Sequence, residues 1–526
     1  MYQQNVDLSL AHSARDPWIE RAIPAGLVLM AVFLFMLCTR QGIGILPDST
    51  RYMSMAARPW DAPLYPALLQ LASLTGIDLV QSAWAVGLAV TIVNTALIWR
   101  ILRESTGLRS YAAMGTALIA IAPQTVTLNA LAMSEPLFLT MILATITAMM
   151  AYWRTGEGRW LLAAGIAVGL ASLVRFTGPP LGAAIALYLL IDPRFTLARR
   201  IGQIALVAAP SALLFLGWTI LSELVVGRSI GRPLRLYGNM TGDDWIKSFN
   251  ALQAWLVPDE VPGAIRTVLF LLAFAAAVVL LVRHGRRALD QAAEGQVDAR
   301  MLVVPLGLFF FTYLGFMIVA TSIEANLHLN SRYAYPIYCT SIIAMTIVLA
   351  HARGSLGRPR WLHGSLVGLG CFMLVIHGLR TADRTHQAYE QGVGYASRDW
   401  TASPTLAAVR QLPQDAILYS NGPDAIGYVL RRRARNMPAH TLLRTGHEDP
   451  RYPYAIQLDS AHAALRRRPT YLVFLNGIHW RFYMASEAEL VRSLDLVLVR
   501  RLSDGSIYTG RTIRPATTSG ERENDD

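Results

Sequence analysis

The side chains best suited to chemistry are carboxylates and arginines close to the ends of apolar segments. Asp48 follows the first apolar segment within a long polar-rich stretch, and Glu135 opens the fourth apolar segment. A positioned carboxylate can take the proton of a hydroxyl nucleophile as a general base. Arg175 and Arg332 lie near the ends of later segments, where a guanidinium can bind an anion through paired N–H donors. This placement is typical of an enzyme that acts at a membrane surface on a lipid-borne substrate.

Each of these four residues also has a purely structural explanation. Asp48 fits a solvated loop acid, and Glu135 fits a charge that the dipole at a helix N-terminus stabilises. Arg175 and Arg332 can extend their side chains to lipid headgroups. A transporter would instead place ionisable groups in the middle of its spans, facing a cavity. The centres of the apolar segments here are nearly free of such groups.

The composition identifies the elements that position these residues. The chain has 526 residues, of which 53% are hydrophobic and only 16% charged, whereas a soluble domain carries about 25% charged residues. Its net charge of +12 comes from arginines between apolar segments, which is how membrane proteins distribute them and argues against a nucleic-acid partner. The three cysteines lie inside apolar segments, so a disulfide framework is excluded.

Eleven segments are predicted to span a membrane, since a spanning helix needs roughly 20 mostly apolar residues. The fifth and sixth are short and separated by Gly178-Pro179-Pro180, so whether both span fully stays open. We therefore expect an all-α polytopic membrane domain over 22–380, with a long first external loop over 40–78. The predicted spans are 22–39, 79–102, 111–130, 134–153, 160–176, 177–192, 201–224, 264–283, 301–322, 333–351 and 361–379.

The arginines also predict the orientation, because cytoplasmic loops are enriched in Lys and Arg. With the N-terminal segment 1–21 in the cytoplasm, every even-numbered connection between spans is short and basic. Most loop acids then fall on the opposite side. The pattern predicts a multi-pass protein of the inner (plasma) membrane whose C-terminal domain lies outside, in the periplasm of a Gram-negative cell.

The C-terminal residues 381–514 are predicted to form a separate external α/β domain. Apolar runs of strand length occur at 416–420, 470–475 and 494–500. Helix start signals lie between them, including a capping box of Ser486 and Glu489. Residues 515–526 are polar and charged, and we expect them to be disordered.

Two motifs in the first half of the chain resemble a known superfamily. Asp48, Tyr52 and Ala56, followed by Pro63-Leu64-Tyr65-Pro66, resemble the first external loop of polyprenyl-phosphate-dependent glycosyltransferases of the GT-C superfamily. These include the protein mannosyltransferase and lipid A aminoarabinose transferase families. Ser134-Glu135-Pro136-Leu137-Phe138 is similar to their second acidic loop.

Two further motifs follow in the expected order. The segment 169–178, with Arg175, is similar to an A-x-L-x-R-x-x-G segment of GT-C mannosyltransferases. His328, Arg332 and Tyr333 resemble their H-x-x-x-R-[FY]-x-x-x-P pattern, which Pro336 completes only loosely. The resemblance covers roughly residues 20–380 and is followed by a C-terminal domain, as in many bacterial members.

The resemblance implies an inverting glycosyltransferase that uses a polyprenyl-phosphate sugar donor and a glycan, lipid or protein acceptor. Asp48 is then the candidate general base, with Glu135 as a second catalytic carboxylate. We expect no cofactor, because the sequence lacks a D-x-D, an H-E-x-x-H and a Cys/His cluster, although a divalent metal at Glu135 stays open. The donor-phosphate candidates are Arg332, Arg175 and His328, and the substrate-binding candidates are Tyr52 and Tyr333.

Other classes of membrane protein also fit part of the pattern. A flippase for lipid-linked glycans has many spans, but it needs polar residues in the core of its bundle and no external domain. An enzyme of the O-antigen-ligase type shares the lipid substrate, but its large polar region is expected between spans. A non-enzymatic envelope assembly protein has only the C-terminal domain in its favour.

Overall fold

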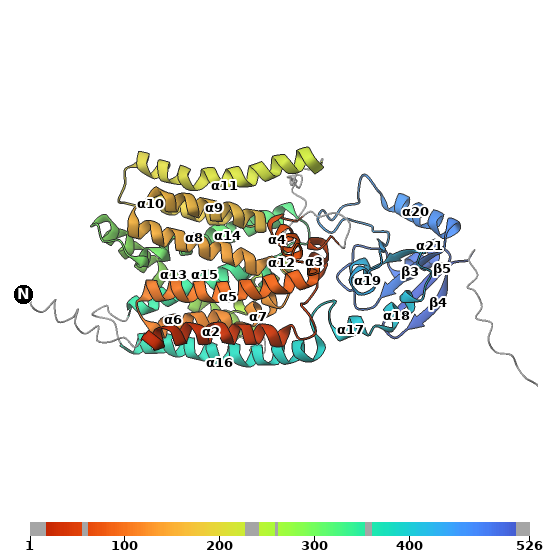
Figure 1. Cartoon of the computed structure of the whole chain (residues 1–526), viewed down its shortest axis with the longest axis horizontal. Helices are drawn as coiled ribbons and strands as arrows, with labels where there is room; N and C mark the ends of the chain where they lie inside the picture. Colours follow the sequence, from red (N-terminus) through yellow and green to blue (C-terminus); the bar gives the residue numbers. More distant parts are fainter. Residues whose placement is uncertain (1–16, 55–60, 227–240, 258–260, 353–359, 512–526) are drawn as a thin grey trace, which may run out of the picture.

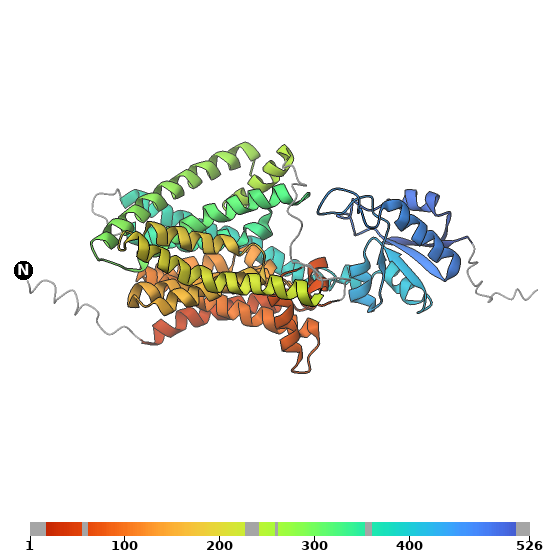
Figure 2. The ribbon, with the colours of Figure 1, turned by 90° about the horizontal axis from the view of Figure 1, so that it is seen from above.

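The computed structural model describes residues 17–54, 61–226, 241–257, 261–352 and 360–511. It has two parts, a bundle of long helices and a smaller C-terminal domain at one end of that bundle (Figure 1). Figure 2 shows the same two parts from above. Residues 1–16 of the predicted cytoplasmic segment and the predicted disordered tail 515–526 lie outside the described residues.

The helical part begins with α2 and ends with α16, which leads into the C-terminal domain. Its helices are α2 Pro17–Cys38, α3 Pro47–Tyr52, α4 Leu64–Ser73, α5 Leu79–Thr106, α6 Arg109–Ala120, α7 Pro123–Asn129, α8 Glu135–Thr155, α9 Gly158–Val174, α10 Pro179–Ile191, α11 Leu197–Val226, α12 Gly242–Gln253, α13 Gly263–Ala293, the 3₁₀ turn Ala299–Leu302, α14 Val303–Ile323, α15 Ser331–Ala352 and α16 Arg360–Gln391.

Seven of the described helices are long and apolar enough to cross a membrane, or eight if a bent pair counts as one span. The fifth and sixth predicted spans coincide with α9 and α10, which are shorter apolar helices. Every predicted span therefore falls on a helix or a bent pair. That the chain is a multi-pass, mainly helical membrane protein is confirmed, whereas the count of eleven spans stays a prediction.

The third predicted span, over 111–130, does not form one straight helix, and whether it crosses as a single span stays a prediction. The structure divides it into α6 and α7, which meet at an angle of 59°. The break falls at Ala122-Pro123, with Pro123 in the first turn of α7. Proline has no backbone N–H to donate, so it is tolerated at a helix start but interrupts a helix interior.

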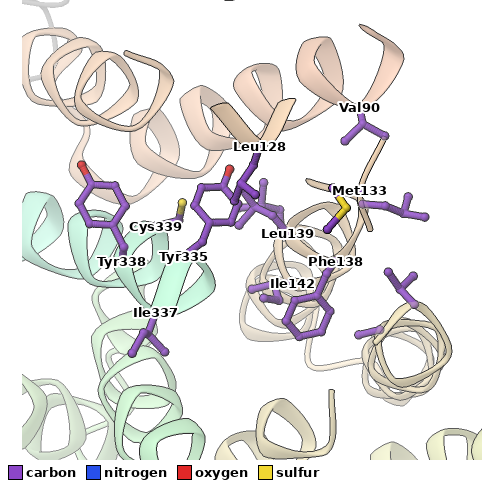
Figure 3. Packing of buried hydrophobic residues seen from close by; sticks show 14 of the residues in the cluster. Val90, Leu128, Met133, Phe138, Leu139, Ile142, Tyr335, Ile337, Tyr338 and Cys339 are labelled. Carbon is purple, nitrogen blue, oxygen red and sulfur yellow. The ribbon is translucent and has the colours of Figure 1, made fainter. Parts of the chain in front are cut away.

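The most buried spans are α8 and α15. Within their most apolar stretches 72% and 78% of the residues are buried, compared with 6% in α11 and in α13. Figure 3 shows side chains of both helices, including Phe138 and Tyr335, packed among their neighbours. Because tight packing limits the movement of both helices, residues at their ends are held in fixed positions.

The first long loop is ordered around two short helices, α3 and α4. Gly44 lies against Leu131, where its N–H donates to the carbonyl of Ala130 (2.8 Å) and its carbonyl accepts from the N–H of Ala132 (2.9 Å). A Cβ atom on Gly44 would come within 2.5 Å of the Leu131 side chain. A side chain at this position would therefore displace Leu131, and the backbone contact holds the start of the loop beside Leu131, just before α8.

The C-terminal domain contains a five-stranded mixed sheet in the order β2-β1-β3-β5-β4. Strand β1 pairs in parallel with both β2 and β3, and β5 pairs antiparallel with both β3 and β4. The elements are α17 Arg398–Thr401, α18 Pro404–Arg410, β1 Ile417–Ser420, α19 Pro423–Leu430, β2 Arg435–Asn436, α20 Tyr454–Arg467, β3 Thr470–Leu475, α21 Glu487–Ser493, β4 Leu496–Leu502 and β5 Gly505–Gly510.

The two parts are joined at the loop that carries α3. Ile45 forms a β-bridge with Gly394, and the N–H of Tyr395 donates to the carbonyl of Ile45 (2.8 Å). On a second connection, the N–H of Ala325 donates to the carbonyl of Arg444 (2.7 Å). The C-terminal domain thus lies over the end of the bundle where α3, α4 and α12 are found (Figure 1).

Candidate functional site

Asp48 lies in the first turn of α3, outside the apolar helices. Pro47 begins this helix, and the N–H of Leu46 donates to Ser49 Oγ (3.0 Å). These local features, with the Gly44 contact, set the direction of the Asp48 side chain, which is 24% exposed.

Glu135 opens α8 and is almost fully buried, with a side-chain exposure of 1%. Its Oε1 atom contacts two arginines, and within the described chain its Oε2 atom has no hydrogen-bond partner. A buried carboxylate at this position needs its cationic partners, because burying a charge without a partner is costly.

Arg175 is positioned by a tight turn that ends α9. Its backbone is extended, its N–H donates to Ala171, and its carbonyl accepts from the N–H of Gly178 (2.9 Å). A Cβ atom on Gly178 would come within 2.5 Å of the backbone of Ser172, so only glycine allows this close approach. The turn directs the Arg175 side chain toward α8.

Arg332 lies in the first turn of α15. The side-chain oxygen of Asn330 accepts hydrogen bonds from the backbone N–H groups of Arg332 and Tyr333 (both 3.1 Å). Asn330 therefore caps this end of the helix in the usual manner of asparagine. The cap fixes the point from which the Arg332 side chain extends.

The structure brings these four residues into one network of ion pairs, with two residues that sequence reasoning missed. Arg332 contacts Glu135 and lies 2.6 Å from Asp48, and Arg175 lies 2.8 Å from Glu135. Arg51 lies 2.6 Å from Asp48 and 2.8 Å from Asp61. We call this set the ionic cluster; its members are Asp48, Arg51, Asp61, Glu135, Arg175 and Arg332.

The charges of the ionic cluster compensate one another, since it holds three carboxylates and three guanidinium groups. Burial would raise the pKa of the Asp48 carboxyl, but the charges and hydrogen bonds of Arg332 and Arg51 outweigh burial and hold that pKa well below its usual range. Asp48 is therefore ionised at neutral pH, and each of its oxygens accepts from a different arginine.

Two predicted tyrosines also lie at the ionic cluster. Tyr52 is buried, packs edge-on against Tyr65 and lies 3.4 Å from Ser134 Oγ, which accepts from Arg175. The ring of Tyr333 lies beside both arginines, with its centre 5.5 Å from the Arg175 guanidinium carbon and 5.9 Å from that of Arg332. Tyr333 thus lies at the edge of the cluster, whereas the buried Tyr52 contacts Ser134, which in turn binds Arg175.

His328 is the predicted site residue that the structure does not bring into the ionic cluster. It lies in the loop between α14 and α15, where its charge acts on Asp244 of α12. The loop turns at Asn326, whose φ of 59° is left-handed.

The C-terminal domain contributes further charged residues that no sequence motif indicated. Arg444 lies close enough for the charges of Asp61, Arg51 and Asp48 to act on it, although burial lowers its pKa. Arg481 forms an ion pair with Asp424, whose pKa is raised by burial. The domain therefore covers the ionic cluster with charged groups of its own.

A cavity lies at the start of α15, where it is lined by Ser331, the chain neighbour of Arg332. It holds about 460 Å³ of empty space, including the part open to solvent. We call it the basic cavity, because it is lined by the basic residues His377, Arg380 and Arg384. Its other lining residues are Ala122, Pro123, Gln124, Ala254, Trp255, Ser331, Tyr335 and Tyr338.

The described residues contain no group of three or more His, Cys, Asp or Glu side chains arranged to hold a metal ion. The carboxylates of the ionic cluster are each engaged with arginine. The residues therefore offer a bound divalent metal no preformed set of ligands in the described part of the chain.

Comparison with known structures identifies the fold. The chain superimposes on ArnT from Cupriavidus metallidurans bound to undecaprenyl phosphate with a TM-score of 0.61 and 13% identity, covering 97% of this chain and 100% of that one. Apo ArnT from the same organism superimposes with a TM-score of 0.59 and 14% identity, covering 94% of this chain and 98% of that one. An oligosaccharyltransferase from Archaeoglobus fulgidus, in complex with Zn and sulfate, superimposes with a TM-score of 0.51 and 12% identity. The match covers 92% of this chain and 73% of that one.

Comparison with protein families gives a match of its own. Residues 59–218 match the family of dolichyl-phosphate-mannose-protein mannosyltransferases. No curated protein sequence matches the chain. The chain thus has the fold of GT-C membrane glycosyltransferases, and the resemblance indicated by its four motifs is confirmed.

Proposed function

We propose that the chain is an integral-membrane inverting glycosyltransferase that moves a hexosyl or pentosyl group from a polyprenyl-phosphate donor to a lipid, glycan or protein acceptor. The observation that carries this proposal is the position of Asp48, an ionised carboxylate held between Arg51 and Arg332 just outside the apolar helices. The family match over 59–218 and the likeness to ArnT bound to undecaprenyl phosphate support the same class.

In the proposed reaction an acceptor oxygen attacks the anomeric carbon of the donor. The new carbon–oxygen bond forms while the bond from that carbon to the phosphate oxygen breaks. The electron pair leaves with the phosphate, and the acceptor proton passes to Asp48. A single displacement inverts the anomeric configuration, and polyprenyl phosphate is the second product.

In this proposal Arg332 interacts with both the general base, Asp48, and the donor phosphate. It contacts Asp48 and Glu135 in the substrate-free arrangement, and a guanidinium has five N–H donors. A donor phosphate competes for some of these donors, so Arg332 moves partly from Asp48 toward the phosphate. Because Arg332 lowers the Asp48 pKa, this shift makes Asp48 a stronger base when the donor is bound.

The remaining site residues have supporting roles in the proposal. Glu135 holds Arg175 and Arg332 in position, and both arginines stabilise the departing phosphate. Tyr333 borders the cluster and is the candidate for contact with the sugar. His328 lies toward α12, so the phosphate role falls to the two arginines, and Tyr52 acts through Ser134 rather than on the substrate.

The proposed orientation places the N-terminus in the cytoplasm and the C-terminal domain outside the inner membrane. It is supported by the basic connections between spans and by the acidic residues near the C-terminal domain. A reporter that is active only outside the cytoplasm, fused after residue 526, should be active. A cytoplasmic readout at that fusion would overturn the orientation.

The catalytic assignment is tested with the purified full-length chain and a panel of polyprenyl-phosphate sugars. We expect sugar transfer and release of polyprenyl phosphate, and a loss of turnover of about 10²-fold or more in Asp48→Asn. This variant keeps the size of the side chain and should still bind the donor. Asp399→Asn, an exposed acid of the C-terminal domain, is the matched control. Normal turnover in folded Asp48→Asn would exclude Asp48 as the base.

A further inference from the structure

We propose that Asp61 is a positioning residue for the general base: it holds Arg51 on one oxygen of Asp48 and so leaves the other oxygen, Oδ2, to take the acceptor proton. The proposal rests on the proposed function and deepens it, because it assigns the proton to one atom. It is carried by the hydrogen bonds that join these three side chains and by their contrast with the contacts of Arg332.

Asp61 holds Arg51 through both of its carboxylate oxygens. Arg51 Nε donates to Asp61 Oδ2 (2.8 Å), and Arg51 Nη2 donates to Asp61 Oδ1 (3.0 Å). Paired hydrogen bonds of this kind fix the plane of a guanidinium as well as its position. The Asp61 side chain is only 13% exposed, so little water competes for these bonds. Asp61 thus sets the direction in which the second N–H of Arg51 Nη2 points.

The same Arg51 Nη2 atom also donates to Asp48. It lies 2.6 Å from Asp48 Oδ1, and the two residues are three apart on α3, which places them on one face of the helix. Asp61 reaches this face from the segment that leads into α4. Both short helices lie at the end of the bundle that faces the C-terminal domain (Figure 1). One arginine therefore links two carboxylates that come from separate segments.

The other oxygen of Asp48 is held in a different way. Arg332 Nη1 lies 2.6 Å from Asp48 Oδ2, and Arg332 in turn contacts a single oxygen, Oε1, of Glu135. Arg175 contacts this same Oε1 atom. Arg332 therefore shares one carboxylate oxygen with a second arginine and lacks the paired hydrogen bonds that hold Arg51. An anionic donor draws Arg332 from Asp48 more readily than it draws Arg51.

This contrast determines which oxygen of Asp48 becomes the base. When the donor draws Arg332 away, Oδ2 loses its hydrogen bond while Oδ1 keeps Arg51. The acceptor O–H bond then breaks as the acceptor oxygen bonds to the anomeric carbon, and the proton passes to Oδ2. The electron pair of the broken bond between that carbon and the phosphate oxygen stays with the phosphate. Without Asp61, Arg51 can turn and the Asp48 carboxylate can rotate with it, so Oδ2 is no longer held toward the acceptor.

The test is steady-state kinetics of the full-length chain, followed by release of undecaprenyl phosphate from an undecaprenyl-phosphate sugar that the donor panel identifies as a substrate. Asp61→Asn keeps the size of the side chain but loses its charge and one acceptor oxygen. We expect kcat to fall about tenfold or more with the donor KM within about twofold of wild type, since misplacing a catalytic group by about 1 Å can cost about 10²-fold. Asp61→Glu restores both oxygens and should recover part of kcat. Asp298→Asn removes an exposed acid that pairs with Arg300 and is the matched control, with kcat unchanged.

A double-mutant cycle tests whether Asp61 acts through Arg51. If it does, Asp61→Asn should change kcat by less than about twofold in the Arg51→Gln background, because members of one hydrogen-bond network have non-additive effects. A purely structural role for Asp61 would instead give effects that multiply. Arg51→Lys keeps the charge but lacks the planar fork. It should lower kcat in the same way, so the proposal stays testable if Asp61→Asn fails to fold.

The positioning role is overturned by a wild-type kcat in folded Asp61→Asn or folded Arg51→Lys. A loss that appears only as a higher donor KM, or effects that multiply in the cycle, would also overturn it. Failure of the proposed function gives a different result. If the wild-type protein releases no undecaprenyl phosphate, or if Asp48→Asn turns over normally, the general-base mechanism itself is contradicted. If Asp48→Asn is impaired and the Asp61 variants are not, only the role of Asp61 is wrong.

Discussion

The ionic cluster and the basic cavity each include a residue from the first turn of α15, Arg332 and Ser331, but they balance their charges in different ways. Every arginine of the cluster is paired with a carboxylate of the same chain. The cavity has cationic side chains and no carboxylate among its described lining residues. The charges of the cluster are balanced before substrate arrives, whereas Arg380 of the cavity donates to a backbone carbonyl and has no ion pair among the described residues.

The largest expected effect comes from breaking the compensation within the cluster. Glu135→Ala leaves Arg175 and Arg332 without their shared buried partner. Removing one member of a buried ion pair costs about 3–5 kcal/mol, so we expect a clear loss of stability in detergent. Arg380→Gln leaves no carboxylate unpaired and should unfold close to wild type. Equal destabilisation of both variants would contradict the contrast between the two regions.

The next effect concerns donor affinity. Arg332→Ala removes a phosphate partner and should raise the KM for the donor by about 10–100-fold, the range for loss of a hydrogen bond to a charged group. Steady-state kinetics over a series of donor concentrations measure it. Arg332→Lys keeps the charge but loses the planar fork, so its KM should lie between the two. A KM equal to wild type in Arg332→Ala would place the phosphate elsewhere.

A smaller effect is expected on the pH dependence. Arg51 and Arg332 hold the pKa of Asp48 below its usual range, so the acidic limb of kcat/KM should lie at lower pH than an ordinary aspartate would give. Arg51→Ala removes one of these charges, raises the Asp48 pKa and moves the acidic limb to higher pH. The free energy of unfolding should also fall as the pH falls, because a carboxyl whose pKa is lowered in the folded state stabilises the fold only while it is ionised. A limb that does not move would show that another group sets it.

The smallest effect is expected at an exposed ion pair that belongs to neither region. His440 Nε2 lies 3.0 Å from Glu489 in the C-terminal domain, and both side chains are partly exposed. Exposed pairs contribute about 0–1 kcal/mol. Glu489→Gln should therefore change the melting temperature by little and leave donor binding unchanged. A loss comparable to that of Glu135→Ala would show that exposure is a poor guide in this protein.

The sequence predicted the helical segments and the four main charged residues of the ionic cluster. Apolar runs determine where helices form, and motif order brought Asp48, Glu135, Arg175 and Arg332 together as candidates. Arg51 and Asp61 were missed because a loop carries no periodic signal, although their spacing from Asp48 within one loop was visible. Pro123 could have predicted the break between α6 and α7, but the apolar run continues through it and favoured a single span.

The basic cavity and the contribution of the C-terminal domain were not predictable from patterns. The spacing of His377 and Arg380 is common on the polar face of any helix, so it does not indicate a cavity. The cavity forms only because α16 packs against α7 and α15. Arg444 reaches the cluster through a loop whose position depends on contacts with Ala325 and Asn326. Long-range contacts of this kind leave no local signature in the chain.

The bridge between Ile45 and Gly394 also bears on how the protein is made. Ile45 is synthesised early, whereas Gly394 follows only after the last helix of the bundle. At about 5–20 residues per second, roughly 20 to 70 s pass between the two. During this interval every residue of the ionic cluster has emerged, yet the loop with Asp48 lacks one of its anchors. Catalytic competence is therefore a late event of biogenesis, and a chain that stops after α16 begins should insert into the membrane without becoming active.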